Sequence, residues 1–170
     1  MKVSKILEVK GKTLFTLGPE ESLATAVMVM AEHDIGSIVV MSDGKLAGML
    51  TFREVIRILA KRQAEHRSGP TPPVSSFKVG EVMNPSPTVA NPDMDVDSLR
   101  KIMVDSHERY LPVMDGPTLL GVVSFHDVAR AVLDMQGFEN KMLKAYIRDW
   151  PAEDGESHGP VAMQKPGQLG

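Results

Sequence analysis

The feature that most constrains the fold of this chain is an internal repeat. Residues 48–55 read GMLTFREV, and residues 121–128, which lie 73 positions later, read GVVSFHDV. The same offset holds upstream without a gap, so that Thr16 matches Val89. A chain with two copies of one supersecondary unit is expected to fold into two similar halves that bury their apolar faces together.

The repeat also sets the predicted domain organisation. A slip of three residues places residues 3–7 on residues 79–83, so each copy begins before its extended entry. Glycine, prolines and hydroxyl residues between the copies are typical of an exposed linker, and similar residues near the end predict a mobile tail. The predicted order is a first repeat, a linker, a second repeat, a helical extension and a tail: residues 3–62, 63–78, 79–135, 136–150 and 151–170.

Each copy has the same predicted order of elements, β-α-β-β-α. A short extended entry leads into proline and acidic residues, which the first turn of a helix tolerates, and then into apolar residues at helical spacing. Two short apolar runs follow, joined by Asp43-Gly44 in the first copy and across residues 115–117 in the second, and these predict hairpins. A second helix begins after each hairpin. The pattern predicts an α/β fold of two tandem units related by a pseudo-twofold axis.

Composition limits the chemistry that the chain can perform. There is no cysteine, which excludes disulfides, thiolate metal sites and a cysteine nucleophile. The five histidines are scattered without a compact ligand spacing, so no metal requirement is expected. The sequence also lacks the glycine-rich phosphate loops and the nucleophile motifs of common enzymes. We therefore expect a protein that is not an enzyme.

Charge and hydropathy limit the classes of partner that the chain is expected to bind. The formal net charge is −3, and aromatic residues make up 5 % of the chain, so a nucleic-acid surface is not expected. No apolar run approaches the roughly 18 residues of a membrane span. The first residues lack the long apolar stretch and cleavage site of a signal peptide. These observations predict a cytoplasmic protein with no membrane partner.

The duplicated unit and its closing motif resemble the tandem cystathionine-β-synthase (CBS) domain pair, also called a Bateman module. The resemblance rests on the duplication, on the sequence YLPV at residues 110–113, and on the motif G-h-h-[ST]-x-x-[DE]-h, with h apolar, at the end of each hairpin. It covers about 135 of the 170 residues and is similar to small stand-alone bacterial CBS-pair proteins.

The resemblance implies regulation rather than catalysis. Members of this family bind adenosine-containing ligands, such as AMP, ADP, ATP, NAD(H) or S-adenosylmethionine, in clefts between the two copies. They commonly form homodimers in which two pairs make a flat disc. The resemblance therefore implies an adenine nucleotide as the regulatory ligand and a disc-like homodimer as the assembly.

The turns from hairpin to helix carry the main candidate site residues. Thr51 with Glu54, and Ser124 with Asp127, can each form a capping box, and this alone explains both pairs. The same helix N-termini offer free N–H groups and a positive dipole end to a phosphate. The resemblance implies that the acid also accepts the ribose hydroxyls. The family usually has Asp there, so Glu54 favours capping alone, and the Asp127 cleft is the preferred site.

Other candidates flank these turns. Arg53 and His126 stand beside the two acids, and Arg109 precedes the YLPV sequence. A guanidinium can bind phosphate bidentately, although a single arginine is more often a solvated surface residue. The resemblance implies that the entry strands and the hairpin starts line the adenine pocket, although each of these residues alone is more often structural. The candidate ligand-binding residues are Thr16, Gly36, Ser37, Ile38, Thr51, Arg53, Glu54, Thr88, Arg109, Tyr110, Leu111, Pro112, Ser124, His126 and Asp127.

These observations predict a regulatory module that binds AMP, ADP, ATP or NAD(H) between its repeats and controls an unidentified partner protein or its own assembly. The alternative is a ligand-independent interaction or dimerisation module, in which both turns serve only as caps and the helix through Tyr146 and Trp150 docks a partner or a second copy of the chain. Glu54 favours this alternative. An enzyme is the least favoured hypothesis, because no nucleophile and base can be paired.

Overall fold

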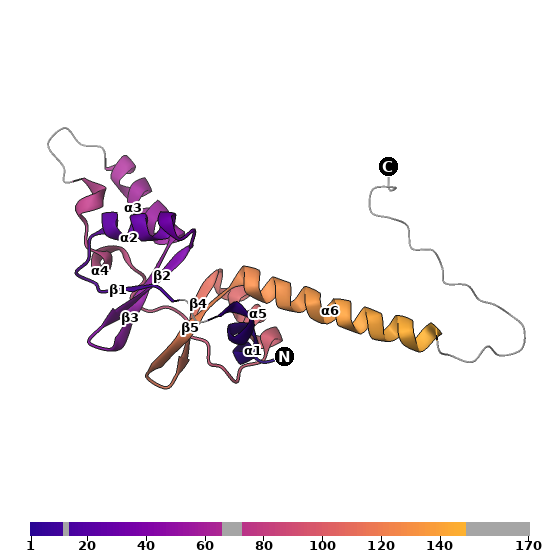
Figure 1. Cartoon of the computed structure of the whole chain (residues 1–170). Helices are drawn as coiled ribbons and strands as arrows, with labels where there is room; N and C mark the ends of the chain where they lie inside the picture. Colours follow the sequence, from indigo (N-terminus) through magenta and orange to yellow (C-terminus); the bar gives the residue numbers. More distant parts are fainter. Residues whose placement is uncertain (12–13, 66–72, 149–170) are drawn as a thin grey trace, which may run out of the picture. The chain divides into compact units, whose positions relative to one another are not determined.

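A computed structural model describes residues 1–11, 14–65 and 73–148 (Figure 1). The chain divides into two units, Met1–Leu133 and Asp134–Gly170. The first unit contains both repeats. The described part of the second is the C-terminal portion of one helix, so the tail predicted over 151–170 lies outside the described residues. None of the described helices is long and apolar enough to cross a membrane.

The order of elements in the structure confirms the predicted α/β fold of two repeats. The first part of the chain forms α1 (Val3–Lys10), β1 (Thr16–Leu17), α2 (Leu23–Glu32), β2 (Ser37–Ser42), β3 (Lys45–Thr51) and α3 (Phe52–Ala64). The second part forms the 3₁₀ helix η1 (Val74–Ser76), α4 (Val79–Val82), α5 (Val96–Ser106), β4 (Tyr110–Asp115), β5 (Thr118–Ser124) and α6 (Phe125–Arg148).

Each repeat has a small sheet built around its hairpin. In the first sheet, β1 pairs in parallel with β2, and β2 pairs with β3 in antiparallel orientation. In the second sheet, β4 pairs with β5, and Ala90 of the entry segment forms a parallel bridge to Val113. The second repeat therefore reproduces the pairing of the first, with its entry strand reduced to one bridge.

The duplication extends to irregularities of the backbone. The hairpin register shifts after Val40 in the first repeat and after Val113 in the second. The turn that follows the first helix of each repeat is also matched, since Asp34 and His107, 73 positions apart, both have left-handed φ angles, of 50° and 59°. Non-glycine residues rarely adopt positive φ. Such matched exceptions indicate that the two repeats preserve one backbone design.

The entry helices are exchanged between the repeats. Helix α1 begins the first repeat in sequence, but its Val3 and Ile6 are buried in the core of the second, with Leu99, Leu111 and Val123. Helix α4 begins the second repeat in sequence, but its Val79 is buried in the core of the first, with Leu23, Ile38, Val40 and Leu50. Each core is therefore incomplete without a segment from the other half of the chain, which ties the two repeats together.

Two glycines, 73 positions apart, allow these entry segments to approach the hairpins. A Cβ on Gly48 would collide with the carbonyl oxygen of Asn84 and lie 2.8 Å from the sulfur of Met83. A Cβ on Gly121 would lie 3.1 Å from the side chain of Leu7. Close backbone approach is a common reason for glycine inside a strand. The first glycine is the stricter requirement, because its neighbour is backbone.

The segment before α4 is only partly the exposed linker expected over residues 63–78. Residues 66–72 of it lie outside the described residues. Val74 and Phe77 are partly buried against the core of the first repeat, and the Phe77 carbonyl accepts a hydrogen bond of 2.7 Å from the N–H of Leu23. The end of this segment is therefore structural, and it places α4 against the first repeat.

Candidate functional site

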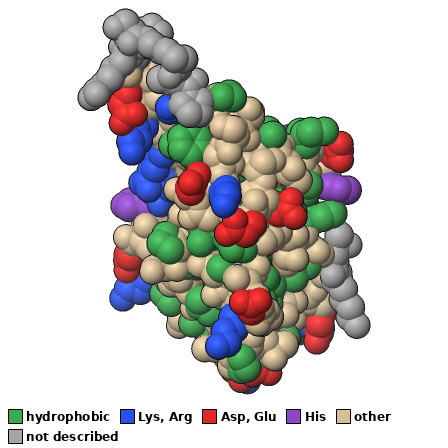
Figure 2. Space-filling view, turned by 90° about the vertical axis from the view of Figure 1, so that its left-hand side faces the viewer, with side chains coloured by type: hydrophobic (Ala, Val, Ile, Leu, Met, Phe, Trp, Pro, Cys, Tyr) green, Lys and Arg blue, Asp and Glu red, His purple; other side chains and the backbone are tan. Residues whose placement is uncertain are grey.

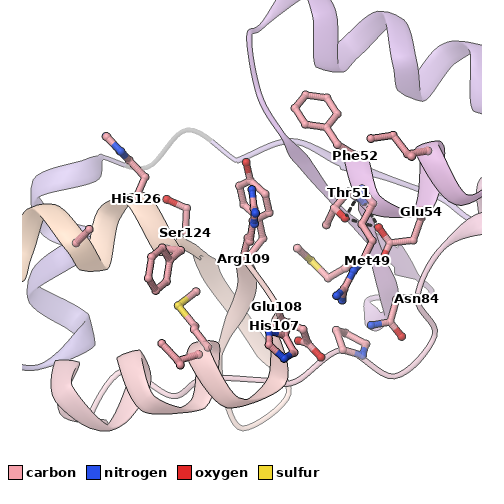
Figure 3. A pocket seen from close by; sticks show the side chains of 18 residues that line it. Met49, Thr51, Phe52, Glu54, Asn84, His107, Glu108, Arg109, Ser124 and His126 are labelled. Carbon is pink, nitrogen blue, oxygen red and sulfur yellow. Dashed lines mark hydrogen bonds between the residues drawn. The ribbon is translucent and has the colours of Figure 1, made fainter.

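A pocket of about 1030 Å³ lies between the two repeats, where β3 leads into α3 and β5 leads into α6 (Figure 3). Both repeats and the segment after α4 contribute to its walls. It lies within the first unit of the chain. The lining residues are Met49, Thr51, Phe52, Arg53, Glu54, Ile56, Asn84, Pro87, Met103, Val104, His107, Glu108, Arg109, Tyr110, Ser124, Phe125, His126 and Ala129.

The first helix N-terminus in the pocket belongs to α3. Thr51 is its N-cap, and the Thr51 hydroxyl accepts a hydrogen bond of 3.2 Å from the N–H of Arg53. The Glu54 carboxylate accepts from the Thr51 N–H at 2.9 Å and from the Thr51 hydroxyl, and both bonds end on Oε2. The capping box expected from the sequence is therefore formed. A carboxylate can accept about four hydrogen bonds, so Glu54 retains acceptor capacity toward the pocket.

The second helix N-terminus belongs to α6, and its acid has a different partner. Ser124 lines the pocket, and its hydroxyl accepts from the Asp127 N–H at 3.0 Å. Asp127 Oδ2 accepts from the Ser124 N–H at 2.9 Å and pairs with Lys10 Nζ of α1 at 2.7 Å. Asp127 is not among the lining residues. The sequence favoured the Asp127 cleft, whereas the pocket that the structure forms contains Glu54.

The environment of Asp127 favours its charged form. Burial acts to raise the pKa of this carboxyl, but the hydrogen bonds from Lys10 and Ser124, together with the charge of Lys10, outweigh burial and lower the pKa below its usual value of 3.8. The side chain is 18 % exposed, and that of Lys10 is 38 % exposed. The pair is therefore partly shielded from water, and it joins α1 to the start of α6.

This pair predicts a loss of stability in acid. The folded state holds fewer protons on Asp127 than the unfolded state near pH 3.8, so the stabilising contribution is complete above that pH and is lost as the pH falls through the lowered pKa. Asp127→Asn should therefore be less stable than wild type in urea unfolding at pH 7, by a margin that shrinks at pH 3. An equal margin at both pH values would contradict this interpretation of the pair.

Two arginines and a histidine, drawn from both repeats, line the same pocket. Arg53 belongs to the first turn of α3, Arg109 directly precedes β4, and His126 belongs to the first turn of α6. In Figure 3, Arg109 lies between Thr51 and Glu54 on one side and Ser124 and His126 on the other. The pocket therefore combines two helix N-termini with three nitrogen side chains, an arrangement suited to an anion.

The pocket also contains an acid that the sequence did not single out. Glu108 accepts from the N–H of Thr88 at 3.1 Å and from its hydroxyl at 3.0 Å, which fixes the entry segment of the second repeat. Thr88, a candidate from the sequence, is thus bound to a lining residue, Glu108, and is not itself among the lining residues. The matching position in the first repeat is Ile35, so the hydrophobic pattern gave no signal for an acid here.

The remaining candidate residues are placed mainly by packing. Tyr110 lines the pocket, and its hydroxyl occupies the space where a Cβ of Gly36 would lie. Ile38 and Leu111 are completely buried in the two cores. The others lie on strands outside the set of lining residues: Thr16 in β1, Ser37 in β2 and Pro112 in β4. The structure thus brings together Thr51, Arg53, Glu54, Arg109, Tyr110, Ser124 and His126.

Four further lining residues, Phe52, Phe125, His107 and Asn84, were not among the candidates from the sequence. Phe52 and Phe125 lie inside the two motifs, at matching positions, with 52 % and 41 % of each residue exposed. His107 immediately precedes Glu108 and takes the left-handed conformation that turns the chain into β4. Asn84 enters through the exchange of entry segments, and its backbone pairs twice with Met49, at 2.8 and 3.0 Å.

The described residues show no grouping that could hold a metal ion. Among residues 1–11, 14–65 and 73–148, no three His, Asp or Glu side chains are grouped so that they could do so. Over the centre of the face shown in Figure 2, hydrophobic, acidic and basic side chains are interspersed, and several Lys and Arg side chains gather along its upper left edge.

Comparison with known sequences places the chain in a family. The family model described as "CBS domain" matches residues 7–61 and 79–134. The chain is 31 % identical over 127 residues to the CBS domain-containing protein YhcV of Bacillus subtilis, covering 75 % of this chain and 84 % of YhcV. It is 30 % identical over 155 residues to the mitochondrial protein CBSX3 of Arabidopsis thaliana, covering 86 % of this chain and 71 % of CBSX3.

Solved structures share the fold. The CBS-domain protein ATU1752 of Agrobacterium tumefaciens superposes with a TM-score of 0.68 at 27 % identity, covering 77 % of this chain and 98 % of that one. CBSX2, solved in complex with AMP, superposes with a TM-score of 0.62 at 21 % identity, covering 79 % and 98 %. Since the family model matches more than half of the chain in two copies, the chain belongs to the CBS domain family and carries a tandem pair of CBS repeats.

Proposed function

We propose that this chain is a regulatory module that binds an adenosine nucleotide, AMP, ADP, ATP or NAD(H), in the pocket that contains Glu54. The observation that carries the proposal is the convergence, in one pocket of about 1030 Å³, of two helix N-termini, three nitrogen side chains and a capping acid. This volume is at the upper end of the range for small-molecule sites and accommodates a nucleotide. The proposed module is not an enzyme and requires no metal.

The phosphate is assigned to the side of the pocket near Arg109. A helix N-terminus presents unpaired N–H groups and a partial positive charge, and both turns that meet here have this property. Arg53, Arg109 and His126 add donors from three different segments. An arginine can bind two phosphate oxygens at once, which orients as well as attracts the group. A phosphate between these residues would contact both repeats.

The ribose is assigned to Glu54. The two Thr51 bonds end on Oε2, so the carboxylate can still accept hydroxyl donors from the pocket. The adenine would then lie toward Met49, Asn84 and Pro87, where apolar and amide groups line the wall. In this assignment Glu54 has both roles that the sequence offered as alternatives, the cap of α3 and a ligand contact.

Regulation follows from the location of the pocket between the repeats. A ligand that touches α3, β4 and α6 stabilises the arrangement of the repeats to which it binds best. It can shift an equilibrium only by its difference in affinity for the two states. We propose that this shift controls a partner protein or a homodimer of the chain. CBSX2, which has the same fold, is solved in complex with AMP. At 21 % identity it is evidence for the fold alone, so the proposed ligand rests on the residues of the pocket.

A thermal-shift panel tests this function. The purified chain is heated with AMP, ADP, ATP, NAD, NADH or S-adenosylmethionine, after a check that no nucleotide was carried through purification. A ligand at 100 times its dissociation constant stabilises the native state by about 2.7 kcal/mol, which raises the Tm by several degrees. A shift with at least one of these ligands is expected. The absence of any shift from a folded, nucleotide-free protein would overturn the proposal.

A ligand-independent interaction module is the second candidate. It is favoured by the capping box of α3, which is complete without a ligand, and by Ile56 and Leu59 on α3, which are 63 % and 50 % exposed. Exposed apolar side chains on one helix are typical of protein contacts. Concentration-dependent assembly without any effect of nucleotides would support this candidate over the first.

A further inference from the structure

We propose that Glu108 restricts the pocket to nucleotides of low negative charge, so that the chain binds AMP in preference to ATP. The inference rests on the proposed function, because it concerns the number of phosphates on the nucleotide in the same pocket. It assigns a role to an acid that the proposed contacts of the ribose and the phosphate leave unused. AMP, ADP and ATP share the base and the ribose, so a preference among them depends on the phosphates alone.

The Glu108 carboxylate is fixed at the wall of the pocket. Its Oε2 accepts a hydrogen bond of 3.1 Å from the Thr88 N–H, and its Oε1 accepts one of 3.0 Å from the Thr88 hydroxyl. The Glu108 N–H in turn donates to the Ser106 hydroxyl at 3.3 Å. In Figure 3, Glu108 lies beside His107 and below Arg109. The negative charge therefore cannot move aside for an entering anion without breaking these bonds.

The charged groups around the pocket balance one another. Arginine and glutamate side chains are charged at neutral pH. The lining contains two of each, so their formal charges cancel: Arg53, Arg109, Glu54 and Glu108. His107 and His126 can add positive charge, since a histidine titrates near neutral pH. No lysine is among the described residues that line the pocket, so the fixed positive charge available to a phosphate chain comes from the two arginines.

The further phosphates of ATP would meet the field of Glu108. AMP carries a charge of about −2 at neutral pH, as a phosphate monoester does, and each added phosphate contributes about −1 more. Glu108 directly precedes Arg109, the residue assigned to the phosphate, so their Cα atoms lie about 3.8 Å apart. Charges in a partly buried site interact more strongly than charges in water. The arginines can neutralise one phosphate, whereas the next two are repelled by Glu108 without a further fixed cation in the described lining.

The first repeat builds the same turn without an acid. The residue that matches Glu108 is Ile35, which is partly buried against the core of the first repeat, and the residue that matches Thr88 is Phe15. Two apolar side chains therefore serve at these positions, and the fold of a repeat does not require a carboxylate there. A purely structural Glu108 would only hold Thr88 in place. That role predicts equal changes in the affinity for every nucleotide when Glu108 is replaced.

Isothermal titration of the full chain with adenosine, AMP, ADP and ATP tests the proposal. The buffer contains EDTA, so that no divalent cation neutralises the phosphates. Wild type should bind AMP at least about tenfold more tightly than ATP. Glu108→Gln removes the charge and keeps an amide oxygen that can accept from Thr88. Its affinity should be unchanged for adenosine and should rise with each added phosphate, by at least about tenfold for ATP.

Asp105→Asn is the matched control. Asp105 is an exposed acid in the last turn of α5, three residues before Glu108, and it lies outside the lining. This variant should leave all four affinities unchanged. Glu108→Ile, which carries the residue of the first repeat, replaces Glu108→Gln if the latter unfolds and should show the same dependence on the charge of the ligand.

The outcomes separate this proposal from the proposed function. A wild type that binds ATP as tightly as AMP overturns the role of Glu108 and leaves the nucleotide pocket in place. Affinities of Glu108→Gln that change by one common factor for all four ligands do the same. If wild type binds none of the four but is stabilised by NAD or NADH in the thermal-shift panel, the role of Glu108 fails and the proposed function stands. Binding of no nucleotide in either experiment overturns both.

Discussion

Replacing Glu54 by alanine should weaken the binding of AMP by about ten- to a hundredfold. The substitution removes a charged acceptor that the proposed function assigns to the ribose hydroxyls, and a hydrogen bond to a charged group contributes about 1.5–3 kcal/mol. The capping box of α3 is lost as well, which should cost about 0.5–2 kcal/mol of stability. Calorimetric titration well below the Tm of the variant separates the two effects.

Two control variants make this result specific. Glu65→Ala removes an acid at the other end of α3, where Glu65 is the C-cap and lies outside the pocket lining, and should leave the affinity unchanged. Asp127→Asn alters the acid that already pairs with Lys10 and should leave AMP bound at wild-type affinity. Retained affinity in a folded Glu54→Ala protein, with loss in Asp127→Asn, would instead assign the site to the second acid.

Replacing Gly48 by valine should destabilise the fold by at least about 1–3 kcal/mol, the usual cost of forcing extra methyl groups into a packed site. The new Cβ would collide with the Asn84 carbonyl oxygen, which accepts a hydrogen bond of 3.0 Å from the Met49 N–H. Backbone held by such a pair cannot move aside cheaply. Because Asn84 and Met49 both line the pocket, AMP affinity should fall as well.

The midpoint of urea unfolding measures this effect. Lys45→Val introduces the same side chain on the same strand at an exposed position and should stay within about 0.5 kcal/mol of wild type. Gly121→Val should cost less than Gly48→Val, because its neighbour at 3.1 Å is the end of the Leu7 side chain, which can rotate. A wild-type midpoint for Gly48→Val would show that the entry segment is not fixed against the hairpin.

Much of the fold could be predicted because each copy of the repeat contains short-range motifs that specify local structure. The turn at Asp43-Gly44 and the motifs before α3 and α6 combine short-range signals that specify a hairpin and a helix start without reference to the rest of the chain. The offset of 73 residues then transferred each local prediction from one copy to the other. The α/β class and the repeat order followed from these two sources.

The exchange of the entry helices was not predictable by the same means. Residues 3–7 and 79–83 carry equivalent apolar patterns, so each would fit either core, and periodicity does not say which core it joins. The same exchange brings Asn84 to the pocket and Lys10 to Asp127. The sequence therefore named the acids at both turns but could not show which of them faces a pocket and which faces a lysine.

Nuclear magnetic resonance of the backbone amides during a titration with AMP tests the central claim most directly. The account predicts chemical-shift changes at residues 51–54, 107–110 and 124–126, because the proposed ligand lies among the two helix N-termini and the segment before β4. Amides on the far side of each core, such as those of α2 and α5 away from the pocket, should change little. Saturating AMP that leaves all three segments unchanged would contradict the account.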